Sequence, residues 1–175
     1  MDRSSRIKGV LAGGSDGWEV FHKSRAMIAA GVPELTIGEH DIRTAAPILQ
    51  EMHRSALGGH TGYAAVPGTD ALRDRIAKRA EERTGVPTTR DNVVVTPGGQ
   101  AGLFAAFMAV CDPGDAALYI DPYYATYPGT LRAAGARAVA VEARADHGFL
   151  PRRADLAAAA EAAKALLINT PNNPT

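Results

Sequence analysis

The sequence is short of cysteine and has no surplus of charge of either sign. Its 175 residues, the length of one ordinary domain, include a single cysteine, Cys111, so no disulfide can form within the chain. A lone thiol fits a reducing compartment. The 19 basic residues balance the 19 acidic ones, which leaves no global attraction to nucleic acid or to a membrane surface. We therefore expect a small-molecule ligand.

Long apolar runs are also missing. The apolar patch near the N-terminus, Val10-Leu11-Ala12, stops at Gly13-Gly14 and is too short for the core of a signal peptide. No run approaches the length of a membrane span. We expect a cytoplasmic protein. The histidines show no spacing typical of metal ligands, so we predict no metal site.

The first half of the chain is predicted to be mostly helical. Residues 1–14 are expected to form a loose N-terminal arm. The predicted elements that follow are a helix from about Ser15 to Gly31, a strand over 34–37, a helix with Thr44 as N-cap, and a helix between Thr69 and Gly85. In the second of these helices the apolar stripe of Ile48, Leu49 and Met52 is expected to face inward.

The stretch from Val93 to Val110 is the most informative. Its three valines predict a strand, Pro97-Gly98-Gly99 a tight loop, and the apolar run that follows a buried helix. The first N–H groups of a helix lack partners inside it and lie at the positive end of its dipole, so they can bind a phosphate. A purely structural turn is the alternative. Neither Gly-x-Gly-x-x-Gly nor a P-loop is present, which weighs against a dinucleotide or a nucleoside triphosphate.

From Val93 onward, predicted strands and helices alternate, which indicates an α/β domain with a mostly parallel sheet. Further strands are expected over 116–120, 138–141 and 165–168. Polar loops follow three of the four strands. These loops are Gly98–Gln100, Asp121–Tyr124 and Asn169–Thr175. Ligands of such sheets bind beyond the carboxyl ends of the strands, so the three loops are expected to converge on one crevice.

Six short motifs occur in a fixed order along the chain. They are Gly38-Glu39-x-Asp41; Gly62-Tyr63 followed by Gly68 and Leu72-Arg73; Thr96-Pro97-Gly98-Gly99-Gln100; Asp112-Pro113-Gly114-Asp115; Pro122-Tyr123-Tyr124; and Pro171-Asn172-Asn173-Pro174-Thr175. From about residue 34 to the end, the chain resembles the class I/II aminotransferases of pyridoxal-phosphate fold type I.

The resemblance implies an aminotransferase-like three-layer α/β/α fold with a mostly parallel central sheet. It implies a division into an N-terminal arm with a small-domain segment, residues 1–45, and the first part of a cofactor-binding large domain, residues 46–175, which would be incomplete. The cofactor it implies is pyridoxal 5'-phosphate.

Residues that match the family's motifs take the roles that the family gives them. The cofactor phosphate would lie on the backbone N–H groups of Gly99 and Gln100, in the loop that begins with Gly98. Tyr124 would stack on the pyridine ring, and Asn173 would donate a hydrogen bond to the phenolic oxygen. The alternatives are an ordinary packed tyrosine and an asparagine that caps a turn; for the neighbouring Asn172 the turn role is the better interpretation.

Two further matches concern the substrate and a second subunit. Gly38 would contact the carboxylate of the substrate through its backbone. Tyr63 would reach across a dimer interface to the phosphate bound by the neighbouring subunit, which implies a homodimer.

The implied reaction moves an amino group between an amino acid and a 2-oxo acid, with the cofactor as electron sink. It needs a lysine that forms a Schiff base, which in this family lies well after the Asn-Pro-Thr motif, whereas all four lysines here precede that motif. We expect an N-terminal portion of an aminotransferase, inactive alone, whose lysine lies beyond Thr175. Two alternatives remain open: another fold type I enzyme (a β-lyase, racemase, decarboxylase or cyclopropane-forming synthase), and a non-catalytic cofactor-binding sensor domain.

Overall fold

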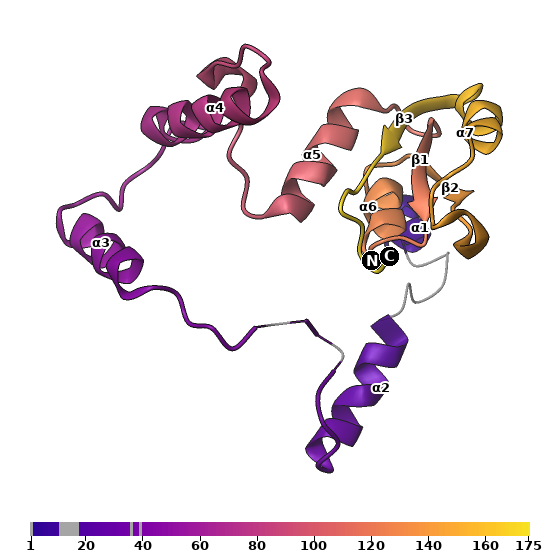
Figure 1. The fold of residues 1–175 in the computed structure, drawn as a ribbon, viewed down its shortest axis with the longest axis horizontal. Coiled ribbons are helices and arrows are strands. Elements are labelled where there is room, and N and C mark those ends of the chain that lie inside the picture. The colour runs from indigo at the N-terminus through magenta and orange to yellow at the C-terminus, as the bar shows by residue number, and fades with distance from the viewer. Residues whose placement is uncertain (1, 11–17, 36, 39) are drawn as a thin grey trace. The chain divides into compact units, whose positions relative to one another are not determined.

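A computed structural model describes residues 2–10, 18–35, 37–38 and 40–175. The chain forms two compact units (Figure 1). The first, here called the sheet unit, joins Met1–Val32 to Pro97–Thr175. The second, the helical unit, is Pro33–Thr96. The predicted domain boundary at residue 45 stays a prediction.

The sheet unit is built on three parallel strands, β1 (Ala116–Asp121), β2 (Arg137–Glu142) and β3 (Ala163–Leu167), in the order β2-β1-β3. Leu118 of the central strand lies opposite Val139 on one side and Leu166 on the other. The predicted parallel sheet is confirmed. Each of its three predicted strands begins or ends within two residues of the observed one.

Helices cover both faces of this sheet. The chain leaves β1 for β2 through α6 (Tyr127–Ala133) and returns past β1 to β3 through the turn η2 (Ala145–His147) and α7 (Arg153–Ala160). Because parallel crossovers are right-handed, two crossovers that run in opposite directions across the sheet place their helices on opposite faces. Helix α5 (Gly99–Val110) packs beside α6 (Figure 1). The result is the expected three-layer α/β/α arrangement.

The core of the sheet unit lies between the sheet and helices α5 and α6. It contains Phe107, Cys111, Ala117, Tyr119, Leu131, Ala134, Ala136 and Leu167. Helix α5 was expected to be buried, and this is wrong for most of its surface. Phe107 is buried and Leu103 packs against the core, whereas Phe104 and Met108 are exposed. Its sequence is apolar on every face, but only one face meets the core.

The N-terminal segment is more ordered than expected. Residues 5–10 form a short helix, α1 (Ser5–Val10), which packs on α6, so the expectation of a loose arm is wrong for these residues. The guanidinium of Arg132 donates to the backbone oxygen of Val10 at 3.0 and 3.2 Å. So short a helix is not stable alone, and contacts with α6 stabilise it. The next predicted helix is confirmed over the described residues as α2 (Trp18–Ala29), while its predicted start near Ser15 lies outside the described residues.

The helical unit contains α3 (Ala46–Leu57), α4 (Asp70–Thr84) and a 3-10 turn, η1 (Arg90–Asn92). Thr69 is the N-cap residue of α4 and Gly85, with φ of 71°, ends it, as predicted. The N-cap of α3 is Ala45 and not Thr44. Its apolar stripe is also not inward: Ile48, Leu49 and Met52 are exposed.

Two predicted strands are absent from the residues that the structure describes. Those between 34 and 37 form no strand, with Thr36 lying outside the described residues. The three valines from Val93 to Val95 also form none, although the backbone is extended at Val93. A strand requires a neighbour that supplies a ladder of hydrogen bonds. Here one bond of this kind is present, from the Val95 N–H to the oxygen of Pro67 at 2.9 Å.

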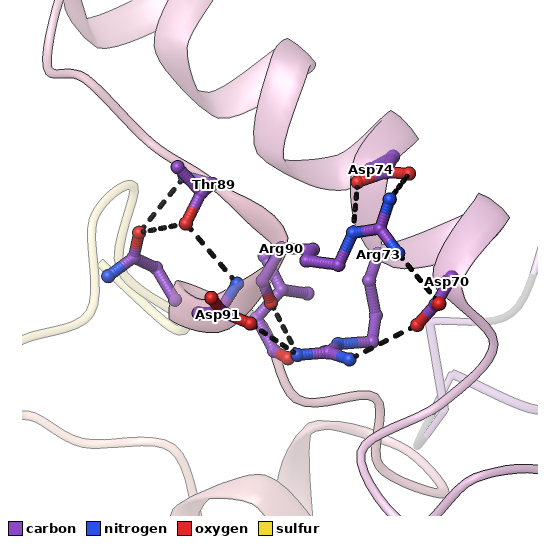
Figure 2. Close-up of polar contacts among 8 residues, drawn as sticks. Asp70, Arg73, Asp74, Thr89, Arg90 and Asp91 are labelled. Carbon is purple, nitrogen blue, oxygen red and sulfur yellow. Dashed lines mark hydrogen bonds and ion pairs between the residues drawn. The ribbon is translucent and has the colours of Figure 1, made fainter.

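A cluster of charged side chains holds η1 against α4 (Figure 2). The nearly buried guanidinium of Arg73 donates to the backbone oxygens of Val93, at 3.0 Å, and Arg90, at 2.7 Å. The guanidinium of Arg90 pairs with both carboxylate oxygens of Asp74, at 2.8 and 2.7 Å, and with Asp70 at 2.6 Å. These bonds link two turns of α4 to the segment that precedes the glycine loop.

No helix within the described ranges combines the length and the apolar character that a bilayer crossing requires.

Candidate functional site

Helix α5 begins at a glycine pair that leaves its first turn open. Gly98 is the N-cap, and its φ of 90° is a backbone conformation that favours glycine. A Cβ atom placed on Gly98 or Gly99 would meet nothing within 4 Å. Among the described residues, the N–H groups of Gly99, Gln100 and Ala101 have no acceptor. Three donors without an acceptor among the described residues therefore lie at the positive end of a 12-residue helix, an arrangement suited to an anion.

The loop after β1 directs two adjacent tyrosines differently. Tyr123 turns back into the core and meets the ring of Tyr119 edge to face, with centroids 5.0 Å apart. Tyr124 is 43% exposed, and its ring lies 5.6 Å from that of Tyr127. Partial burial, with Tyr124 beside it, raises the pKa of the Tyr127 hydroxyl. Tyr124 thus presents an aromatic ring beyond the carboxyl end of the central strand.

The loop after β3 is held by Asn172. Its side-chain amide donates to the backbone oxygen of Pro122 at 3.0 Å and to the hydroxyl of Thr175 at 2.7 Å. Its oxygen accepts a hydrogen bond from the side chain of Asn169 at 3.2 Å. Asn173, by contrast, is exposed. This agrees with a structural role for Asn172 and leaves the side chain of Asn173 accessible to a ligand.

Hydrogen bonds join the three loops. The hydroxyl of Thr126, next to the loop after β1, donates to Oε1 of Gln100 at 2.7 Å. Asn172 joins the loop after β3 to Pro122. The loops Gly98–Gln100, Asp121–Tyr124 and Asn169–Thr175 are therefore linked to one another through Thr126 and Pro122, although no strand precedes the first loop. A common crevice lined by all three loops stays a prediction.

Two predicted site residues belong to the helical unit. Tyr63 is fully exposed in the segment between α3 and α4, and Gly38 lies in the irregular segment that precedes α3. Their roles, and those of Tyr124 and Asn173 toward a cofactor, stay predictions.

Thr126, the N-cap residue of α6, and Thr130 within that helix were not predicted to belong to the site. Both hydroxyls bond the side chain of Gln100, the Gln100 amide nitrogen donating to Thr130. A signal for this exists in the sequence: Gln100 is the one polar side chain in the otherwise apolar stretch 99–110. A polar side chain in such a helix requires a hydrogen-bond partner wherever it is buried.

Comparison with known proteins gives a consistent result. The family model for aminotransferase class I and II matches residues 31–175. The chain is 36% identical to an arginine–pyruvate transaminase of Pseudomonas aeruginosa, over 99% of this chain and 44% of that protein. It is 37% identical to an aspartate/prephenate aminotransferase of Thermus thermophilus, over 81% of this chain and 37% of that protein.

A solved structure shows the same likeness in three dimensions. The aspartate aminotransferase of Thermotoga maritima superposes with a TM-score of 0.90 at 36% identity, covering 99% of this chain and 46% of that one. The chain thus spans less than half the length of the relatives it matches.

Proposed function

This chain belongs to the aminotransferase class I and II family, and we propose that it serves the transfer of an amino group between an amino acid and a 2-oxo acid, with pyridoxal 5'-phosphate as cofactor. Pyruvate and prephenate, which the relatives' names contain, are both 2-oxo acids, and arginine and aspartate are both amino acids. The proposal stops at these classes, since the relatives' names differ in the substrate itself.

The observation that carries the proposal is the open first turn of α5. The phosphate of the cofactor carries about two negative charges and accepts several hydrogen bonds, which fits the N–H groups of Gly99 and Gln100. Gly98 supplies the turn that exposes them. The exposed ring of Tyr124 would stack on the pyridine ring, and the accessible amide of Asn173 would donate to the phenolic oxygen. The residues present therefore fit this cofactor.

When bound, pyridoxal phosphate supplies an electron sink for the negative charge that develops at Cα of the substrate. The described residues would bind and orient the cofactor. Gly38 would bind the substrate carboxylate through its backbone, and Tyr63 would contact the phosphate held by a partner subunit in a homodimer.

The lysine that the reaction requires is not among these site residues. Lys164 lies near the start of β3, at the opposite end of that strand from Asn169–Thr175. Lys8, Lys23 and Lys78 lie on α1, α2 and α4. We infer that amino-group transfer also requires residues outside these 175.

Removal of a single backbone N–H donor tests the proposed phosphate site. Proline is favoured at the first position of a helix and has no N–H, so Gly99→Pro removes one donor without opposing the helix. Gly99→Ala, which keeps the N–H and places its Cβ in open space, is the matched control. We expect Gly99→Pro to weaken binding of pyridoxal phosphate about 10- to 100-fold relative to Gly99→Ala, the usual effect of a hydrogen bond to a charged group.

Equilibrium dialysis against pyridoxal phosphate and against pyridoxal provides the measurement. The wild-type chain should prefer the phosphorylated form. Equal affinity for the two forms, or equal binding by the two variants, would overturn the assignment of the phosphate to α5.

A further inference from the structure

The side chain of Gln100 forms a bridge from α5 to α6. Its Oε1 accepts a hydrogen bond from the hydroxyl of Thr126 at 2.7 Å, and its Nε2 donates to the hydroxyl of Thr130. The hydroxyl of Thr130 in turn donates to the backbone oxygen of Thr126 at 2.8 Å. Because the proton of Thr130 is used in this way, the amide nitrogen must face Thr130 and the amide oxygen must face Thr126.

One end of this bridge is buried and the other is exposed: Thr130 is shielded from water, whereas the side chain of Gln100 is exposed. Thr130 is only 4% exposed and lies next to Leu131 of the apolar core. No buried side-chain nitrogen or oxygen among the described residues lacks a partner. Two hydrogen bonds from one side chain, one of them to a buried hydroxyl, favour the arrangement of α5 and α6 in which both can form.

The bridge also lies between the two halves of the candidate site. Gln100 is the second residue of α5, so its own N–H is one of the open donors. Thr126 is the N-cap residue of α6 and follows Tyr124 by two positions. The glycine pair before Gln100 gives the backbone wide freedom. The side chain of Gln100 restrains that freedom by fixing the start of α5 to the start of α6.

We propose that Gln100 is a positioning residue, whose side chain holds the phosphate donors of α5 at a fixed distance from the ring of Tyr124. A ligand that carries both a phosphate and an aromatic ring is then recognised at both ends at once, without the cost of ordering the loop. This role rests on the proposed function, because it assumes pyridoxal phosphate as the ligand. In this proposal the backbone N–H of Gln100 binds the phosphate, and the side chain of Gln100 positions that N–H relative to Tyr124.

The test compares ligands that contact one half of the site or both. Inorganic phosphate needs only the α5 donors and can follow them wherever they move, whereas pyridoxal phosphate needs the donors and the ring together. We expect Gln100→Ala to weaken binding of pyridoxal phosphate about three- to tenfold, the usual effect of one or two neutral hydrogen bonds. Binding of inorganic phosphate should change by less than about twofold, within the range of effects that involve no lost hydrogen bond.

Variants of Thr126 give an independent check on the full chain. Thr126→Ala removes one end of the bridge and should weaken binding of pyridoxal phosphate as much as Gln100→Ala does. The double variant Gln100→Ala/Thr126→Ala should lose little further affinity, because both changes break the same contact. Thr126→Ser keeps the hydroxyl and should restore both the affinity and the induced circular dichroism of bound pyridoxal phosphate. Gln50→Ala, in exposed α3, is the matched control and should leave both ligands unaffected.

The outcomes separate the two proposals. Equal weakening of phosphate and pyridoxal phosphate by Gln100→Ala would show a general disturbance of α5 and would overturn the positioning role alone. A wild-type chain that binds neither ligand would overturn the proposed function, and the positioning role with it.

Discussion

Gly68 provides a direct test of the packing in the helical unit. Its φ is 106°, and a Cβ atom built on it would lie 2.7 Å from Cγ2 and 2.9 Å from Cβ of Val95. Carbon atoms in contact are normally about 3.5–4.0 Å apart. Gly68→Ala therefore adds about 1–3 kcal/mol of overpacking to about 1–2 kcal/mol of backbone strain, and we expect a total cost of about 2–5 kcal/mol.

Gly85 is the matched control, because it isolates the backbone contribution. Its φ of 71° also favours glycine, but a Cβ there would meet nothing within 4 Å. Gly85→Ala should cost only about 1 kcal/mol, since the strain is partly offset by the lower entropy of the unfolded chain. Combining Gly68→Ala with Val95→Ala removes the contact with Cγ2 but leaves that with Cβ, so we expect partial recovery.

Hydrogen exchange of the α4 amides reports the stability of the helical unit separately from that of the sheet. The free energy of opening should fall in the order wild type, Gly85→Ala, Gly68→Ala, with the double variant between the last two. Equal losses at the two glycines would refute the close approach of Gly68 and Val95.

Two further predictions concern the core of the sheet unit. Leu131 is fully buried, so Leu131→Ala should lower the free energy of unfolding by about 2–5 kcal/mol in urea titrations, whereas Leu150→Ala, at an exposed position, should change it by less than about 0.5 kcal/mol. Burial in the first place, and the carboxylate of Asp115 in the second, raise the pKa of the Cys111 thiol above its ordinary value, so the folded state retains the proton more strongly. This contribution to stability is present below the thiol pKa of the unfolded chain and is lost as the pH rises through the higher folded pKa. Cys111→Ala should remove this loss of stability at alkaline pH. An equal loss of stability in the wild type and the variant as the pH rises would contradict this reasoning.

The sheet could be predicted because its signals are local. Asp112-Pro113-Gly114-Asp115 contains the residues that turns require. In the structure the backbone N–H of Asp112 donates to the carboxylate of Asp115 at 2.9 Å, and the backbone N–H of Asp115 donates to the backbone oxygen of Asp112 at 3.1 Å. The run 116–120 that follows is apolar and short, as a buried parallel strand should be. Turn chemistry and strand length are properties of a few consecutive residues, and such predictions succeeded here.

The open glycine loop at the start of α5 could be predicted for the same reason, but the bridge from Gln100 to α6 could not. Gly98 and Gly99 mark the open start of α5 by themselves. Gln100 acts through Thr126 and Thr130, which lie 26 and 30 residues farther along the chain. The only hint was a polar residue in an apolar helix, which indicates that a partner exists without identifying it.

Several of the predictions that failed concern how one segment packs on another. The apolar stripe of α3 was expected to face inward, yet Ile48 and Met52 are 62% and 65% exposed. Periodicity identifies the face of a helix that prefers to be covered, but burial also needs a second surface, just as a strand needs a neighbour to supply its hydrogen bonds. The roles predicted for Tyr63 and Gly38 are of this kind, because one needs a partner subunit and the other a substrate. Those of Gly98, Gly99 and Gln100 depend on a backbone that the chain forms by itself, so the phosphate site is where the proposed function should be tested first.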